Sequence, residues 1–288
     1  MIYLLNFLRW SMRPLFWLPA PAAVYLMELA GEATYRIARL TPVKKMTVRN
    51  FQTVLPEADA NLLADKALRN AGHTIFEIIC APYFNNSHLD RLTKVAGLEN
   101  LDLALAEKKG AVCLSMHSGN YELTSAVLAS RGYQMTAVMK SPPGDKLYAF
   151  LDRSRLYKGA KLINILDGNM YRECLQALAR GRCVGILVDT GALEGRHEML
   201  PFLGHQVPIA TGWTTLAQRS GAPVVPFFSK REGDKVVFII GRPLHISGDN
   251  KAAVMEEIRK FYEGMVKAHP DQWAIFLNEP EVKRMMGK

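Results

Sequence analysis

Short apolar runs alternate with amphipathic helical segments along the chain from residue 110 onward. The helical segments close on glycines, as at Gly132 and Gly181. Strands that are apolar almost throughout must be covered on both faces, which is typical of parallel sheets in α/β proteins. We therefore predict an α/β fold with a mostly parallel central sheet and helices on both faces. The predicted strands are AVCLSM, YQMTAVM, KLINIL, CVGILVD, APVVPFF and KVVFIIG.

The last two apolar runs are separated only by a tight turn, REGD, at residues 231–234. A turn this short joins antiparallel neighbours. The predicted sheet is therefore mixed, with an antiparallel strand near one edge. In sheets of this class, ligand chemistry collects at the carboxyl ends of the strands. His117 and Asp189 both occupy such predicted ends.

The N-terminal segment differs in charge from the rest of the chain. Residues 1–50 carry seven Lys and Arg against two Glu, more than half of the net charge of +9. We expect a basic, aromatic, membrane-interacting helical segment over residues 1–48 and a single domain over residues 49–288. Residues 14–27 are uncharged, but two prolines interrupt them and a spanning helix needs about 20 residues. We interpret the segment as lying in the lipid headgroup region; the alternative is a helix packed on its own domain.

Several classes of function lack support in the sequence. A basic, aromatic segment is also compatible with nucleic-acid binding, but no RNP-like, zinc-finger or helix-turn-helix pattern accompanies it, so we expect no nucleic-acid partner. No HExxH, GxGxxG or GxxxxGK[ST] motif occurs, and we expect neither a metal nor a cofactor. The four cysteines form no CxxC pair and lie in apolar runs, which indicates reduced thiols in a cytosolic compartment.

The strongest chemical pattern is a histidine at a strand end with an acid five residues later. His117 ends the AVCLSM run, and Glu122 follows the turn Ser118-Gly119-Asn120. If a helix begins near Asn120, the carboxylate of Glu122 can fold back onto the imidazole, fix its tautomer and leave the second ring nitrogen to act as a base. Backbone N–H groups of the first turn, with the Asn120 amide, would stabilise negative charge. The alternative is a capped turn without catalytic chemistry.

Residues 117–122, HSGNYE, resemble the His-x4-Glu/Asp signature of the lysophospholipid acyltransferase superfamily. The flanking residues are similar to its lipid A late acyltransferase branch, the lauroyl and myristoyl transferases, whose usual form is His-Phe/Leu-Gly-Asn-Trp-Glu. The resemblance covers about residues 48 to 275 and keeps the order of five further motifs. These motifs are VRNFQTVLPEA, RSRLYKGAKLIN, LVDTGALEGRHEMLPFLG, LAQRSGAPVVPFFSKR and HPDQW.

The resemblance implies transfer of a fatty acyl chain from a thioester, on acyl carrier protein or coenzyme A, to a hydroxyl of a lipid acceptor. His117 would act as general base, oriented by Glu122. A lipid A precursor is one candidate acceptor, and a phospholipid, aminolipid or glycolipid precursor is another. The resemblance also implies a peripheral or monotopic protein on a membrane surface, at the cytoplasmic face of a bacterial inner membrane.

Four residues are candidates for substrate binding. Asn120 lies in the signature itself, and Arg155, with Arg153 as a second candidate, lies on a helix expected beside the cleft. Asp189 matches an aspartate of the family, and Arg196 belongs to a Glu-Gly-Arg stretch that is similar to the acceptor-phosphate motif of the wider superfamily. The alternatives are a solvated helix face for Arg155 and a loop-capping role for Asp189.

The C-terminal end departs from the usual pattern of the branch. After HPDQW the chain reads AIFLNEPEVKRMMGK, without the His and paired Arg that ordinarily follow the Trp. This departure motivates an alternative function, a non-catalytic lipid- or acyl-carrier-binding protein that retains the acyltransferase fold.

Overall fold

A seven-stranded sheet forms the centre of the computed structural model, which describes residues 2–156, 159–189 and 197–286. The strand order is β1-β9-β8-β2-β5-β3-β4. β8, β2, β5, β3 and β4 run parallel, β9 pairs antiparallel with β8, and β1 pairs parallel with β9. The predicted mixed, mostly parallel α/β fold is confirmed, including the hairpin at residues 231–234. The strands are β1 Thr93–Ala96, β2 Ala111–Ser115, β3 Met135–Met139, β4 Lys161–Asn164, β5 Cys183–Leu187, β8 Val224–Glu232 and β9 Lys235–Ile240.

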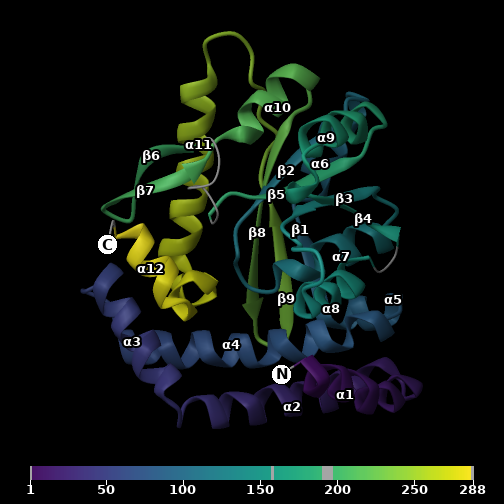
Figure 1. Ribbon diagram of the computed structural model, residues 1–288, viewed down its shortest axis with the longest axis vertical. Coiled ribbons are helices and arrows are strands. Elements are labelled where there is room, and N and C mark those ends of the chain that lie inside the picture. The colour runs from purple at the N-terminus through teal and green to yellow at the C-terminus, as the bar shows by residue number, and fades with distance from the viewer. Residues whose placement is uncertain (1, 157–158, 190–196, 287–288) are drawn as a thin grey trace.

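Helices cover both faces of this sheet (Figure 1). α9, α10 and α11 pack on one face, and α6 and α7 pack on the other. The α-helices are α1 Ile2–Met12, α2 Ala20–Ala38, α3 Pro42–Val54, α4 Ala60–Cys80, α5 Asn86–Leu92, α6 Leu98–Ala106, α7 Thr124–Ser130, α8 Lys146–Arg155, α9 Met170–Ala179, α10 Gly212–Ser220, α11 Lys251–Ala268 and α12 Glu279–Met285.

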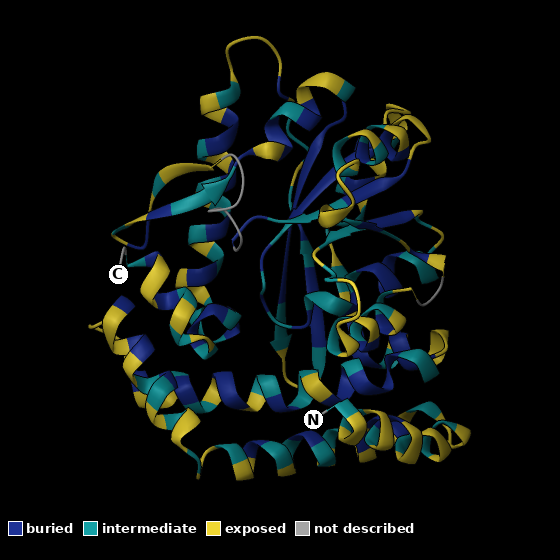
Figure 2. Cartoon of the chain, in the orientation of Figure 1, coloured by how far each residue is buried: buried dark blue, intermediate teal, exposed yellow. Residues whose placement is uncertain are grey.

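The central strand β2 shows why the predicted runs are apolar on both faces. Val112 and Leu114 pack into the core on the side of α10 and α11, whereas Ala111 and Cys113 pack on the opposite side with α6. Successive side chains of a strand point to opposite faces, so a strand buried between two helical layers has no polar positions. Figure 2 shows the sheet as the most buried part of the molecule.

The N-terminal helices lie along one end of the sheet. α4 crosses this end, and α2 packs along its outer side (Figure 1). The two helices approach closely where Gly31 meets Gly72, since a Cβ on Gly72 would stand 2.6 Å from the Gly31 carbonyl oxygen. In the described part of the chain, no helix is both long enough and apolar enough to cross a bilayer.

A second, two-stranded sheet was not predicted from the sequence. β6, His197–Phe202, pairs antiparallel with β7, His205–Ala210. Prolines at 201 and 208, and polar residues at the first two positions of each strand, hide this hairpin from a search for apolar runs. Phe202 and Val207 nevertheless join the main core.

The N-cap of α4 gives a test of stability. The Asp59 carboxylate accepts hydrogen bonds from the backbone N–H groups of Asn61 and Leu62. We expect Asp59→Ala to lower the free energy of unfolding by about 1 kcal/mol, measured by urea denaturation. Glu57→Ala, an exposed acid just before the cap, is the control. Equal stabilities for the two variants would contradict the capping role.

Candidate active site

The site lies at the carboxyl ends of two neighbouring parallel strands. β2 and β5 pair in register, with Ser115 opposite Leu187. His117 and Asp189 each follow their strand by two residues, so the register brings them side by side. The imidazole Nδ1 of His117 lies 2.8 Å from Oδ1 of Asp189. The structure therefore joins two predicted site residues that are 72 positions apart in the chain.

The second oxygen of the Asp189 carboxylate is also hydrogen-bonded. Oδ2 accepts from the backbone N–H of His117 at 2.9 Å and from the indole Nε1 of Trp273 at 2.8 Å. The side chain is only 1% exposed. Burial raises the pKa of Asp189, but the charge and hydrogen bonds of His117, together with the Trp273 bond, lower that pKa below its ordinary value. Asp189 therefore remains ionised, and Nδ1 of His117 carries the proton between them.

Opposing electrostatic effects determine the pKa of the His117 imidazole. Burial lowers its pKa, but the charge and hydrogen bond of Asp189, aided by the charge of Glu122, raise it above the ordinary value against the opposing charge of Arg155. The ring of Tyr121 packs edge-on against the imidazole, with 4.8 Å between ring centroids. The imidazole side chain remains 25% exposed.

The turn after His117 is fixed by contacts to two other segments. Gly119 has φ +52°, and a Cβ there would stand 2.7 Å from the carbonyl oxygen of Ser229 on β8, so only glycine fits. The N–H of Gly119 donates to the carbonyl of Gln272, and the N–H of Ala274 donates to the carbonyl of His117. Ser229 also donates its hydroxyl to the Ser118 carbonyl.

We expected the carboxylate of Glu122 to bind the imidazole of His117. In the structure it is bound to Arg155 instead. Nε and Nη2 of Arg155 each donate to a different Glu122 oxygen at 2.6 Å, a bidentate pair. Burial lowers the pKa of Arg155, but the hydrogen bonds and charge of Glu122 raise it well above its ordinary value. Glu122 lies in a single 3-10 turn, Tyr121–Leu123, from which it reaches α8. The partner of Nδ1 in the structure is Asp189, and Glu122 acts on His117 through its charge.

Asn120 is buried and faces the protein interior. Its amide donates to Oε2 of Glu77 at 2.7 Å, and Oε1 of Glu77 accepts from Arg231 at 2.6 Å. The predicted contact of Asn120 with substrate is therefore replaced by a contact with α4. Arg153 is exposed, and the predicted residue Arg196 lies outside the described residues.

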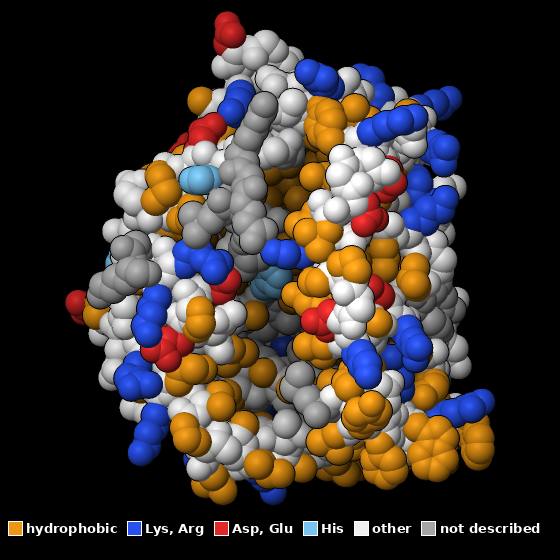
Figure 3. Space-filling model, viewed as in Figure 1, with side chains coloured by type: hydrophobic (Ala, Val, Ile, Leu, Met, Phe, Trp, Pro, Cys, Tyr) orange, Lys and Arg blue, Asp and Glu red, His pale blue; other side chains and the backbone are white. Residues whose placement is uncertain are grey.

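A mainly apolar pocket lies next to Asp189. Its lining includes two charged residues, Asp189 and Arg259, and otherwise consists mainly of hydrophobic side chains, most of them from β6, β7, α10 and α11. Figure 3 shows a hollow in this face of the molecule with hydrophobic side chains on its walls. Within the described ranges, no group of His, Cys, Asp and Glu is placed to hold a metal ion. The apolar lining residues include Met116, Val188, Leu200, Phe202, Ile209, Trp213 and Ile258.

Comparison with known proteins places the chain in a family. The model of the bacterial lipid A biosynthesis acyltransferase family matches residues 2–279, so the chain belongs to this family and is an acyltransferase. It is 25% identical over 232 residues to phosphatidylinositol mannoside acyltransferase from two strains of Mycobacterium tuberculosis, covering 78% of this chain and 73% of the relative. It is also 25% identical over 195 residues to lipid A biosynthesis lauroyltransferase from Escherichia coli, covering 66% of this chain and 62% of the relative.

Two residues of the site were not predicted to act there. Trp273 is the tryptophan of the HPDQW motif, which carried the family resemblance without a role for its indole. Glu77 is an acid among apolar residues in the sequence of α4, and the structure shows that it is buried. Acids are rarely buried unless they are paired. An acid among apolar residues was therefore the signal that the sequence offered.

The pairing of His117 with Asp189 can be tested by titration. We expect Asp189→Asn to lower the pKa of His117 by one unit or more, since burial would then act without the compensating charge. Glu122→Gln should lower this pKa less, because Glu122 acts only through its charge. NMR titration of labelled histidine measures both. A larger effect for Glu122→Gln than for Asp189→Asn would contradict the assignment.

Proposed function

We propose that the protein transfers a fatty acyl chain from an acyl thioester to a hydroxyl of a lipid acceptor, with His117 as general base. The observation that carries the proposal is the imidazole held by the ionised Asp189 beside an apolar pocket. Because Nδ1 is engaged by Asp189, Nε2 is the nitrogen that takes the proton. Asp189 thus replaces Glu122 as the group that orients the base.

The proposed reaction is a direct attack. Nε2 removes the proton of the acceptor hydroxyl while the oxygen attacks the thioester carbonyl carbon. The carbon–sulfur bond then breaks, and the imidazolium returns its proton to the departing thiolate. Asp189 stabilises the imidazolium that forms in between.

The pair of Glu122 and Arg155 has an electrostatic role in this proposal. The Glu122 charge raises the pKa of His117, and the charge of Arg155 opposes this effect in part. Because Arg155 holds the Glu122 carboxylate, Glu122 does not compete with Asp189 for the imidazole proton. Both side chains lie within the protein, at 15% and 7% exposure for Arg155 and Glu122. Arg155 thus acts through Glu122, and Arg196 remains the predicted ligand for an anionic substrate group.

The pocket next to Asp189 is the proposed site of the acyl chain. Most of its lining is aliphatic or aromatic, and Asp189, the carboxylate that holds the base, is also part of the lining. A chain bound there would present its thioester carbonyl to His117. Either acyl carrier protein or coenzyme A is the proposed thioester donor.

The proposed acceptor is a glycolipid. The relatives are named for acylation of lipid A and of phosphatidylinositol mannoside, both of which are glycolipids. A sugar hydroxyl at a membrane surface is a suitable nucleophile for a base at the end of an open cleft.

An apolar face on the N-terminal helices supports membrane docking. Large hydrophobic side chains of α1, α2 and the short helix between them are exposed, and Figure 3 shows hydrophobic side chains gathered along this edge. Exposed aromatics beside the basic residues of this segment suit an anionic lipid surface. Because thioester donors are cytoplasmic, we assign this face to the cytoplasmic leaflet of the inner membrane. The N-terminal apolar face comprises Tyr3, Leu4, Phe7, Trp10, Trp17, Leu18, Tyr25, Leu26 and Leu29.

Loss of the base should abolish turnover. We expect His117→Ala to transfer acyl groups at least about a hundredfold more slowly than the wild type, the usual size of general-base catalysis. Lauroyl-coenzyme A and a total bacterial lipid extract supply donor and acceptors, and mass spectrometry detects the products. His245→Ala, an exposed histidine paired with Glu107, is the matched control. Wild-type turnover in His117→Ala would overturn the proposed mechanism.

The role of the N-terminal apolar face in membrane docking can be tested by introducing a single negative charge. Trp17 is 80% exposed, and we expect Trp17→Glu to weaken binding to anionic vesicles about tenfold or more, since it exchanges a large apolar side chain for a like charge. Leu103→Glu on α6, where the leucine is 61% exposed, should bind as the wild type does. Vesicle sedimentation measures both. Equal losses in both variants would remove the N-terminal apolar face from the proposal.

A further inference from the structure

We propose that Arg9 of α1 is a positioning residue of the acyl-transfer site: it fixes α8 and thereby the pair of Arg155 and Glu122 beside His117. The N-terminal helix is then part of the support of the active site and not only a membrane-docking element. The catalytic meaning of this inference rests on the proposed function of His117, but the contacts that carry it do not.

Arg9 differs from the other side chains of α1. It is only 7% exposed and is the one buried residue of α1, whose other side chains are exposed or only partly buried. Its guanidinium donates to the carbonyl of Ile79 at 3.0 Å, the carbonyl of Phe150 at 3.3 Å and the hydroxyl of Ser154 at 2.8 Å. The Cζ atom of Arg9 also lies 3.4 Å from the centroid of the Phe150 ring.

None of these contacts of Arg9 is with a carboxylate. Burial lowers the pKa of Arg9 to about 10, so the side chain is charged at neutral pH and its burial is only partly compensated. Attraction to a lipid surface does not explain a guanidinium that faces inward. A role in holding α4 and α8 together does explain it.

The contacts of Arg9 lead directly to the active site. Ser154 receives the Arg9 bond and donates in turn to the carbonyl of Ile78 on α4. The next residue, Arg155, makes the bidentate pair with Glu122. Since consecutive residues of one helix move together, a change at Ser154 is transmitted to Arg155.

A displaced Arg155 changes the charge near the base. Among the described residues, the charged and titratable groups that face His117 include Asp189, Glu122, Arg155 and Tyr121. Of these, Arg155 alone lowers the pKa of the imidazole. When its pairing with Glu122 is loosened, the carboxylate charge is less compensated and the pKa of His117 rises.

NMR titration of labelled histidine tests this inference without any substrate. We expect Arg9→Met to raise the pKa of His117 by about half a unit or more. Ser154→Ala should produce a shift of the same sign, and because this change is neutral, direct loss of a charge cannot cause it. Arg155→Met sets the upper limit of the shift, and His117→Gln identifies the His117 signal.

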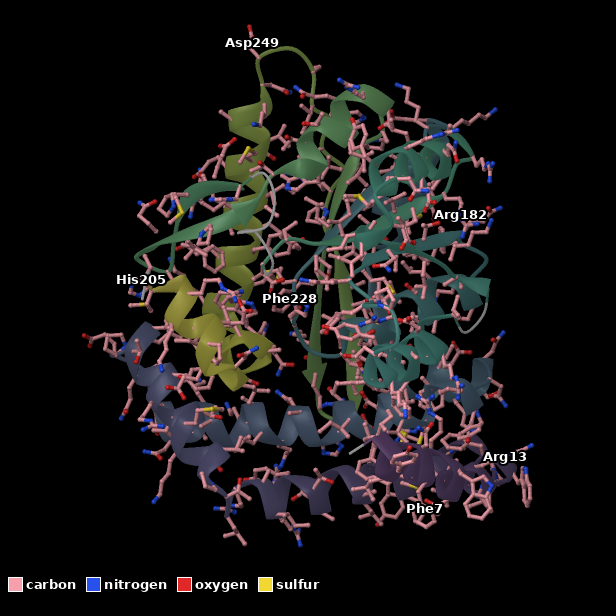
Figure 4. All side chains as sticks on the ribbon, viewed as in Figure 1. Phe7, Arg13, Arg182, His205, Phe228 and Asp249 are labelled. Carbon is pink, nitrogen blue, oxygen red and sulfur yellow. The ribbon has the colours of Figure 1, made fainter. Side chains whose placement is uncertain are left out.

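Arg13→Met is the matched control. It removes the same charge from an exposed position, four residues further along the chain. Figure 4 shows Arg13 and Phe7 directed away from the sheet. We expect the pKa of His117 to be unchanged in this variant and restored toward the wild-type value in Arg9→Lys.

A His117 pKa equal to that of the wild type in Ser154→Ala and in folded Arg9→Met would overturn the inference. Should Arg9→Met fail to fold, Ser154→Ala alone decides. A shift that appears equally in Arg13→Met would also overturn it. Failure of the proposed function would appear instead as turnover in His117→Ala, which leaves this titration unaffected.

Discussion

A buried carboxylate, Asp189, is the group on which the site depends. A charge without solvent is tolerated only where donors replace water, and Asp189 has three: the imidazole and backbone N–H of His117 and the indole of Trp273. These donors come from two distant parts of the chain, at residues 117 and 273. The same bonds that keep the carboxylate ionised therefore fix the imidazole and set its protonation behaviour.

The α/β fold supplies the geometry for this arrangement. Parallel pairing of β2 and β5 places the two strand ends together, and the glycine turn at Gly119 lets the chain pass close to β8. The charges of a second ion pair, Arg155 with Glu122, shift the pKa of the His117 ring in opposite directions. Asp189 also forms part of the lining of the mainly apolar pocket.

The strands of the central sheet other than β1, and the helices between them, could be predicted because the residues that form them are apolar at regular spacing. β1 and the β6–β7 hairpin were not predicted. The partner of His117 was not predicted correctly, because spacing along the chain favoured Glu122. In the structure, the register between β2 and β5 brings Asp189 into contact with His117. Asp189 was nevertheless predicted to lie at a strand end, and the order of the strands was the missing information.

The role of the N-terminal segment illustrates the same limit. Its basic and aromatic composition indicated a surface segment, but one of its arginines is buried against α4 and α8. Composition averages over residues and does not identify the one that faces inward. Val24 and Met27 of α2 are likewise buried, so this segment packs on the domain and also exposes an apolar face.

The pH dependence of kcat/KM for acyl transfer tests the central claim most directly. If neutral His117 is the base, kcat/KM should rise with pH and level off above the pKa of His117, which the Asp189 charge raises above its ordinary value. The midpoint should equal the His117 pKa measured by NMR in the same protein. A rate independent of pH between about 5.5 and 8.5, or a midpoint that differs from the titration of His117, would contradict it.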